Sequence, residues 1–128
     1  MKQLTEEQFD LFQQYLNIVS EIEDGFAYVI DSFTDFSKTE GELVLTDILQ
    51  ALTSITSSNT LLERLLVEDE FVQQAIINFQ DVTDAAFKLE GHLDEYGFKT
   101  KVINDFLYPA FSAWREIIEK ALVGYVTQ

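Results

Sequence analysis

The chain has 128 residues, of which 47% are hydrophobic, and its 23 acidic and 8 basic residues give a formal net charge of −15. This length is that of a single domain covering residues 1–128, and the hydrophobic content is sufficient for a packed core, which excludes a disordered chain. So much negative charge repels nucleic-acid phosphates and anionic lipid, so we expect neither nucleic acid nor a membrane as a partner.

Three further features limit the classes of function. The chain contains no cysteine, which excludes a disulfide framework, a thiol nucleophile and cysteine-ligated metals. No apolar run is long enough to cross a bilayer, and the first residues lack the positive and apolar regions of a secretory signal. Together these features predict a cytoplasmic protein.

The first predicted helix covers residues 5–36. Residues 5–8 (Thr-Glu-Glu-Gln) fit a capping box, in which the Thr5 hydroxyl and the Gln8 side chain each bond the backbone of the other residue. Apolar residues then recur at helical spacing, whereas Gly25 falls on the polar side. The main line of the apolar face is Phe9, Phe12, Leu16, Val19, Phe26, Ile30 and Phe33.

The second predicted helix covers residues 40–66, and residues 39–42 (Thr-Glu-Gly-Glu) fit a second capping box. Residues 53–60 are mostly serine and threonine, which are poor helix formers, so the helix either bends or splits near 57–60. We favour one continuous, bent helix because serine and threonine pairs bend helices more often than they end them. The alternative is a new short helix capped by Thr60.

The third predicted helix covers residues 69–96. Its apolar residues keep an alternating three- and four-residue spacing, which is typical of a long helix packed lengthwise against others. Gly97 follows directly, in the position of a left-handed C-cap. The apolar line is Val72, Ala75, Phe79, Val82, Ala86, Leu89, Leu93 and Tyr96.

The fourth predicted helix covers residues 100–126 and contains Pro109, which lacks a backbone N–H, so we expect a kink there. Long amphipathic helices joined by short turns must reverse direction at each turn. The sequence therefore predicts an all-α fold, a single antiparallel up-down-up-down four-helix bundle.

No motif for catalysis or for binding a metal or cofactor is found. Di-metal bundles need paired Glu-x-x-His motifs, but the only histidine is His92, and the residue three before it is Leu89. The five glycines are scattered and form no phosphate-binding loop. We therefore expect no cofactor and no metal, and the sequence favours a non-enzymatic protein without deciding the question.

Three polar residues fall on apolar faces of the predicted helices: Glu23, Asn59 and Glu90. A carboxylate held in an apolar interior has a raised pKa, and two that face each other would be a candidate for acid–base chemistry. The simpler interpretation places each glutamate at the edge of its face, where the side chain reaches water. For Asn59 the simpler interpretation is a residue that sets the helix register or caps a helix.

Two sets of residues are candidates for binding a partner. Tyr28 lies among acids on the polar face of the first helix, where it would suit a basic peptide, although a lone exposed aromatic is commonplace. Tyr108, Leu122 and Val126 lie outside or at the margin of the apolar face of the fourth helix. Surplus apolar surface of this kind predicts self-association as a two-fold homodimer.

The function favoured by these features is a non-enzymatic protein–protein interaction module, in which a groove or surface of the bundle binds another helix. One alternative is a bundle that binds a small molecule, or an enzyme, using Glu23 and Glu90 in an aromatic-lined core. The predicted fold and the charge, without any residue motif, also resemble those of export- and secretion-type chaperones. A protein partner, a second copy of the chain, or both are expected.

Overall fold

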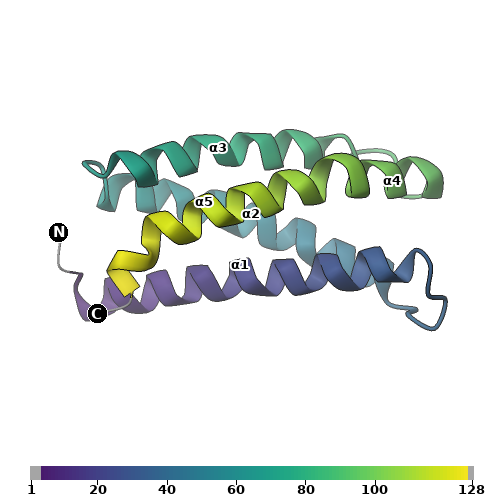
Figure 1. Ribbon diagram of the computed structural model, residues 1–128, viewed down its shortest axis with the longest axis horizontal. Helices are drawn as coiled ribbons and strands as arrows, with labels where there is room; N and C mark the ends of the chain where they lie inside the picture. Colours follow the sequence, from purple (N-terminus) through teal and green to yellow (C-terminus); the bar gives the residue numbers. More distant parts are fainter. Residues whose placement is uncertain (1–3, 127–128) are drawn as a thin grey trace.

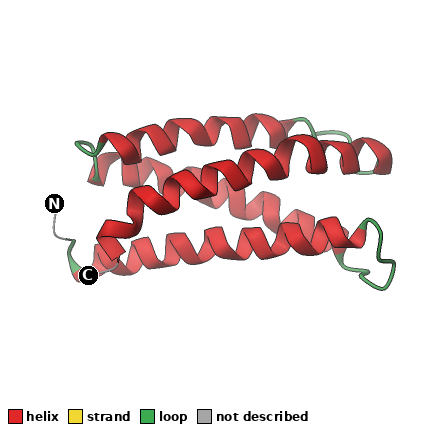
Figure 2. Ribbon diagram, in the orientation of Figure 1, coloured by secondary structure: helices red, strands yellow, loops and turns green. Residues whose placement is uncertain are grey.

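The computed structural model describes residues 4–126, and within that range it is helical and contains no strand (Figure 2), as the sequence predicts. The elements are α1 (Glu6–Ser32), α2 (Gly41–Leu65), α3 (Glu70–Phe87), α4 (Tyr96–Val102), the π-helical turn η1 (Ile103–Leu107) and α5 (Tyr108–Val126).

The helices lie lengthwise beside one another and form a bundle (Figure 1). The α4, η1 and α5 segments follow one another without a break and make one long helical rod. The turn between α2 and α3 lies at the same end of the bundle as the chain termini (Figure 1). The connections over residues 33–40 and 88–95 lie at the opposite end, so they bring distant parts of the sequence together there.

The core runs along the whole bundle and contains large side chains from every long helix. Trp114 is at its centre, where the indole Nε1 donates to the Ala75 carbonyl at 3.0 Å and the ring packs against Phe79 at 4.6 Å between centroids. The fully buried members of the core include Phe12, Phe26, Ile55, Leu62, Phe111, Ile118 and Leu122.

Three predicted helix boundaries are wrong. α1 ends at Ser32 rather than residue 36, α3 ends at Phe87 rather than residue 96, and α4 begins at Tyr96 rather than residue 100. The left-handed glycine is Gly91, with φ of 78°, and not Gly97, which lies inside α4. A glycine adopts positive φ without steric cost, so Gly91 accommodates the turn that follows the end of α3, and a new helix begins at Tyr96.

One of the two predicted capping boxes is confirmed. The Thr5 hydroxyl accepts from Gln8 N–H at 3.1 Å, and the Gln8 side chain accepts from Thr5 N–H at 3.0 Å. The second box does not form, because the N-cap of α2 is Glu40 and no side chain caps this end. The Glu40 N–H instead donates to the Tyr28 hydroxyl at 3.1 Å, which satisfies the donor from a neighbouring helix.

α2 is continuous from Gly41 to Leu65, so the alternative in which it splits near 57–60 is wrong. Within residues 53–60, four hydroxyls bond the carbonyl four residues before them, which keeps them compatible with helical backbone. These bonds run from Thr53 to Leu49, Ser54 to Gln50, Thr56 to Leu52, and Thr60 to Thr56.

Gly25 lies where α1 approaches α2, not on the polar side as predicted. A Cβ atom at this position would lie 3.0 Å from Ile48 Cγ1 and 3.5 Å from Val44 Cγ1. The glycine therefore permits the close approach of the two helices.

Pro109 lies just after η1. In this π-helical turn the N–H bonds the carbonyl five residues before it, as the Tyr108 N–H donates to the Ile103 carbonyl. A proline cannot donate to the carbonyl four residues before it, and its ring clashes with that carbonyl. The wider turn lies directly before the proline, and π-helical turns of this kind relieve such conflicts within helices. The kink predicted at Pro109 stays a prediction.

A candidate binding groove between α2 and α3

α2 and α3 are packed less closely than α1 and α2 or than α3 and α5. A groove with a volume of about 320 Å³ lies between them. It extends along α2, along the last turn of α3 and into the connection that follows. Its walls are formed by Leu49, Leu52, Thr53, Thr56, Thr83, Ala86, Phe87, Leu89, Glu90 and Leu93. We call this the α2/α3 groove.

The groove exists because small residues face each other across it. Thr53 and Thr56 on α2, with Thr83 and Ala86 on α3, are too short to fill the space between the helices. The three threonine hydroxyls donate to carbonyls within their own helices, at 3.2 Å, 3.1 Å and 3.3 Å. Their donors are therefore satisfied, and the methyl groups are left to give the groove an apolar wall.

The rim of the groove carries exposed apolar side chains. Phe87 is 64% exposed and Leu93 is 44% exposed, and both line the groove. Phe87 is the last residue of α3 and Leu93 follows the turn at Gly91, so the early end of α3 places Leu93 at the mouth of the groove rather than in the core.

Glu90 is exposed at the same rim, as the simpler interpretation of its position predicts, and the alternative in which it is held in the apolar interior is wrong. That alternative assumes that the helix continues through residue 90, but α3 ends at Phe87. Among residues 4–126, Glu90 is the only ionisable residue that lines this groove.

A second pocket, of about 270 Å³, adjoins the α2/α3 groove and shares Leu93 with it. We call it the Lys99 pocket. It is lined by Glu42, Leu45, Thr46, Leu93, Asp94 and Lys99.

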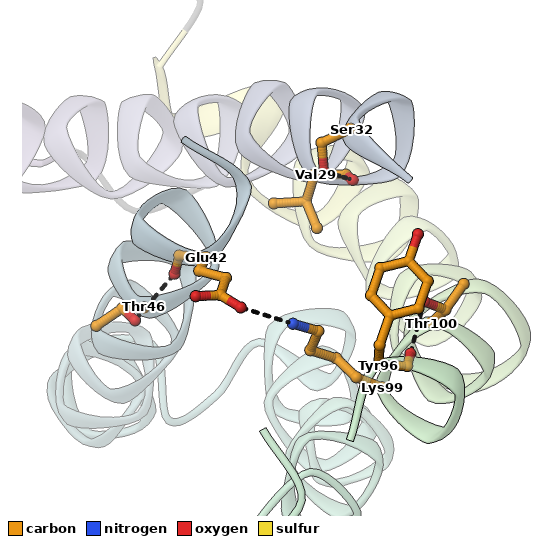
Figure 3. Close-up of polar contacts among 7 residues, drawn as sticks. All are labelled: Val29, Ser32, Glu42, Thr46, Tyr96, Lys99 and Thr100. Carbon is orange, nitrogen blue, oxygen red and sulfur yellow. Dashed lines mark hydrogen bonds and ion pairs between the residues drawn. The ribbon is translucent and has the colours of Figure 1, made fainter. Parts of the chain in front are cut away.

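Lys99 extends from α4 across this pocket towards the first turn of α2, as Figure 3 shows. Its Nζ lies 3.5 Å from Glu42 Oε1, and its side chain is 7% exposed, whereas that of Glu42 is 89% exposed. Lys99 falls just before the predicted start of the fourth helix, at residue 100, and the sequence predicts no role for it. Its three-residue spacing from Tyr96 and from buried Val102 was the signal that could have placed it on the inner face.

Glu23 is half-buried between α1 and α5. Its Oε1 lies 3.2 Å from Arg115 NH1, and its Oε2 is buried without a hydrogen-bond partner among residues 4–126. Arg115 also donates to Glu119 at 3.2 Å. The neighbouring Glu23 side chain raises the pKa of Tyr108, and burial raises it further.

Glu23 and Glu90 lie at different helix interfaces, the first between α1 and α5 and the second between α2 and α3. The structure therefore does not bring the two carboxylates into one site. The hypothesis of a shared aromatic-lined acid–base site is wrong.

Asn59 is buried, with 5% of its surface exposed, and lies on the inner face of α2. Its Oδ1 accepts a hydrogen bond of 2.6 Å from the Tyr15 hydroxyl on α1. Burial raises the pKa of Tyr15, so the phenol remains a donor. The pair fixes α1 against α2 and is not open to a ligand.

The four residues predicted to bind a partner have other positions. Tyr28 is half-buried and accepts the hydrogen bond from Glu40. Tyr108 packs on Phe26 with ring centroids 5.4 Å apart. Leu122 is fully buried in the core, so its assignment to the surface is wrong, and Val126 is half-buried. The surplus apolar surface expected on the last helix is therefore smaller than predicted.

Within residues 4–126, no three or more histidine, aspartate or glutamate side chains are grouped so as to hold a metal ion. In the same range, none of the helices has the length and apolarity needed to cross a membrane.

Residues 10–117 match a family described as a domain of unknown function (DUF8042), and the chain belongs to this family. The chain is also similar to the "Uncharacterized protein YvzG" of Bacillus subtilis (strain 168), with 32% identity over 56 residues. That match spans 44% of this chain and 45% of the relative, so the chain covers about half the length of this relative. No solved structure matches the chain.

Proposed function

We propose that this DUF8042 protein is a non-enzymatic interaction module that binds a helical segment of another protein in the α2/α3 groove. The observation that carries the proposal is the groove itself, which is open, apolar and flanked by the exposed side chains of Phe87 and Leu93. Exposed apolar surface of this kind is typical of sites that bind other proteins.

A helix is the occupant that the shape of the groove favours. The groove lies between two helices, and its α2 wall is formed by Leu49, Leu52, Thr53 and Thr56, at helical spacing. Such a wall presents ridges and hollows that match the apolar face of a third helix.

Binding is favoured over catalysis because the groove is poor in reactive groups. General acid–base or nucleophilic chemistry needs at least two convergent polar groups. Here the threonine donors are engaged with backbone carbonyls, and Glu90 is the single ionisable group at the rim. An apolar small molecule is the competing occupant, because about 320 Å³ is at the lower end of ligand-pocket volumes.

Position-specific photo-crosslinking in the cells that make the protein tests the proposal. Phe87 at the groove and Phe71 at the other end of α3 are both phenylalanines with most of their surface exposed, so each can be replaced by a photoreactive phenylalanine analogue. Phe71 is therefore a control matched in residue type, helix and exposure. We expect a discrete adduct with another protein from position 87 and not from position 71.

A groove-filling substitution, Thr53→Trp, should abolish the adduct from position 87 while leaving thermal unfolding close to that of the parent, because Thr53 is exposed. The same adducts from both positions, or no protein adduct from position 87, would contradict the proposal. An adduct of two copies of the chain would instead assign the groove to the predicted homodimer.

A further inference from the structure

The α2/α3 groove and the Lys99 pocket adjoin at Leu93 and lie along a single face of α2, and we call the two together the depression. Residues 49–56 of α2 line the first, residues 42–46 line the second, and Leu93 belongs to both. At 1.5 Å per residue, the stretch from residue 42 to residue 56 is about 21 Å long, or about four helical turns. A surface of this length accommodates more than a single side chain.

The two halves of the depression differ in polarity. The half between α2 and α3 is apolar except for Glu90 at its rim. The other half carries Glu42 and Asp94, both exposed, and one base, Lys99. The depression therefore has three acids against one base, and its acids are concentrated towards one end.

Lys99 does not neutralise the negative charge that a ligand in the depression would contact. Lys99 is almost completely buried and is already paired with Glu42, whereas the Glu42 carboxylate remains largely exposed. Figure 3 shows one Glu42 oxygen directed at the Lys99 ammonium and the other directed away from it. The chain as a whole carries −15, which adds attraction for any cationic partner.

We infer that the occupant of the depression is a basic amphipathic helix of about four turns. Its apolar face covers the Thr53 and Thr83 walls, and a lysine or arginine near one end lies against Glu42 and Asp94. Apolar contact supplies affinity, while the charges at one end fix the direction of the bound helix. This inference rests on the proposed function and adds the charge and the orientation of the partner.

Two designed peptides of about 16 residues test the inference, since this length spans about four turns. Both carry the same leucine and alanine stripe, and the remaining positions are lysine in one peptide and glutamine in the other. Binding of each fluorescently labelled peptide is measured by anisotropy at low and at moderate salt. We expect the lysine peptide to bind about ten-fold more tightly at low salt, and this preference to shrink with added salt.

Matched charge variants separate local recognition from general attraction. Glu90→Gln with Asp94→Asn removes two exposed acids from the depression, whereas Asp24→Asn with Asp31→Asn removes two exposed acids from α1. We expect the Glu90→Gln, Asp94→Asn variant to bind the lysine peptide about five-fold more weakly, which is the effect of losing two exposed charge pairs. The control variant on α1 should change the affinity by less than about two-fold.

Three results would overturn the inference. Equal binding of both peptides would refute the basic character of the partner while leaving the groove as a helix-binding site. Equal losses from the two charge variants would assign the preference to net charge alone. If neither peptide binds and position 87 gives no protein adduct, the inference and the proposed function fail together.

Discussion

Thr53, Thr56 and Thr83 give the groove its apolar character although each has a hydroxyl group. Their hydroxyls donate within their own helices, so the methyl groups are what a partner meets. The sequence shows these threonines but not the direction of each hydroxyl, because that depends on the helix being continuous through residues 53–60. The polar character of the stretch predicted a bend or a break rather than an apolar wall.

Buried polar residues were predictable in part. The phase of Asn59 placed it on the inner face of α2, but its partner, Tyr15, lies 44 residues away in sequence and could not be identified. The spacing of Glu90 continues that of Val72, which left burial of its side chain open as an alternative, and Glu90 is exposed because α3 ends before it, at Phe87. The burial of Lys99 was not predicted, because a lysine is almost never buried unless it is paired.

Replacing Tyr15 with phenylalanine should lower the free energy of unfolding by about 1 to 3 kcal/mol, because Asn59 Oδ1 loses its donor in a buried site. Chemical denaturation near neutral pH measures this difference. Burial raises the folded pKa of Tyr15 above its ordinary value of 10.0. The stabilisation is therefore complete below pH 10 and is lost as pH rises above it, so the difference between the two proteins should narrow in alkali.

Adding Asn59→Leu to Tyr15→Phe is the control for this prediction. The double variant should be less destabilised than the sum of the two single variants, because the second change removes the unpaired acceptor that the first one leaves. Additive losses, or a difference that stays constant above pH 10, would mean that the hydrogen bond does not couple α1 to α2.

At the scale of whole elements, the four helical segments were predictable because the apolar periodicity is strong in each of them. Helix ends were harder to predict. The apolar line of α3 continues through Leu89, which is buried, so spacing alone could not distinguish further helix from a turn that returns one side chain to the core. The spacing predicted an end at Gly97, and only the backbone conformation shows that the left-handed glycine is Gly91.

This difference predicts opposite effects of alanine at the two glycines. Gly91→Ala should destabilise the protein by about 1 kcal/mol or more, because an L-residue is strained at φ of 78°. Gly97→Ala should be neutral or stabilise it by up to about 1 kcal/mol, because Gly97 is helical and no atom lies within 4 Å of an added Cβ. Thermal unfolding of the two variants measures both effects, and equal effects would refute this position for the end of α3.

At the scale of the whole molecule, the early end of α3 has a consequence for function. Because the chain leaves the α3 axis after Phe87, α2 keeps one face that no helix covers completely, and acids collect along it. The net charge of −15 was readable from composition, but its position relative to an apolar groove was not, because that depends on how the helices pack. The function proposed here depends on that combination of an apolar groove and an acidic end.

Mapping backbone amide shifts of isotope-labelled protein during titration with the lysine peptide tests this combination most directly. The account predicts that the largest shifts fall on residues 42–56 of α2 and residues 83–94, which line the α2/α3 groove and the Lys99 pocket. Amides near Asp24 and Asp31, which are exposed on α1, should change little. Shifts that are largest on α1, or spread evenly over the acidic surface, would contradict the account.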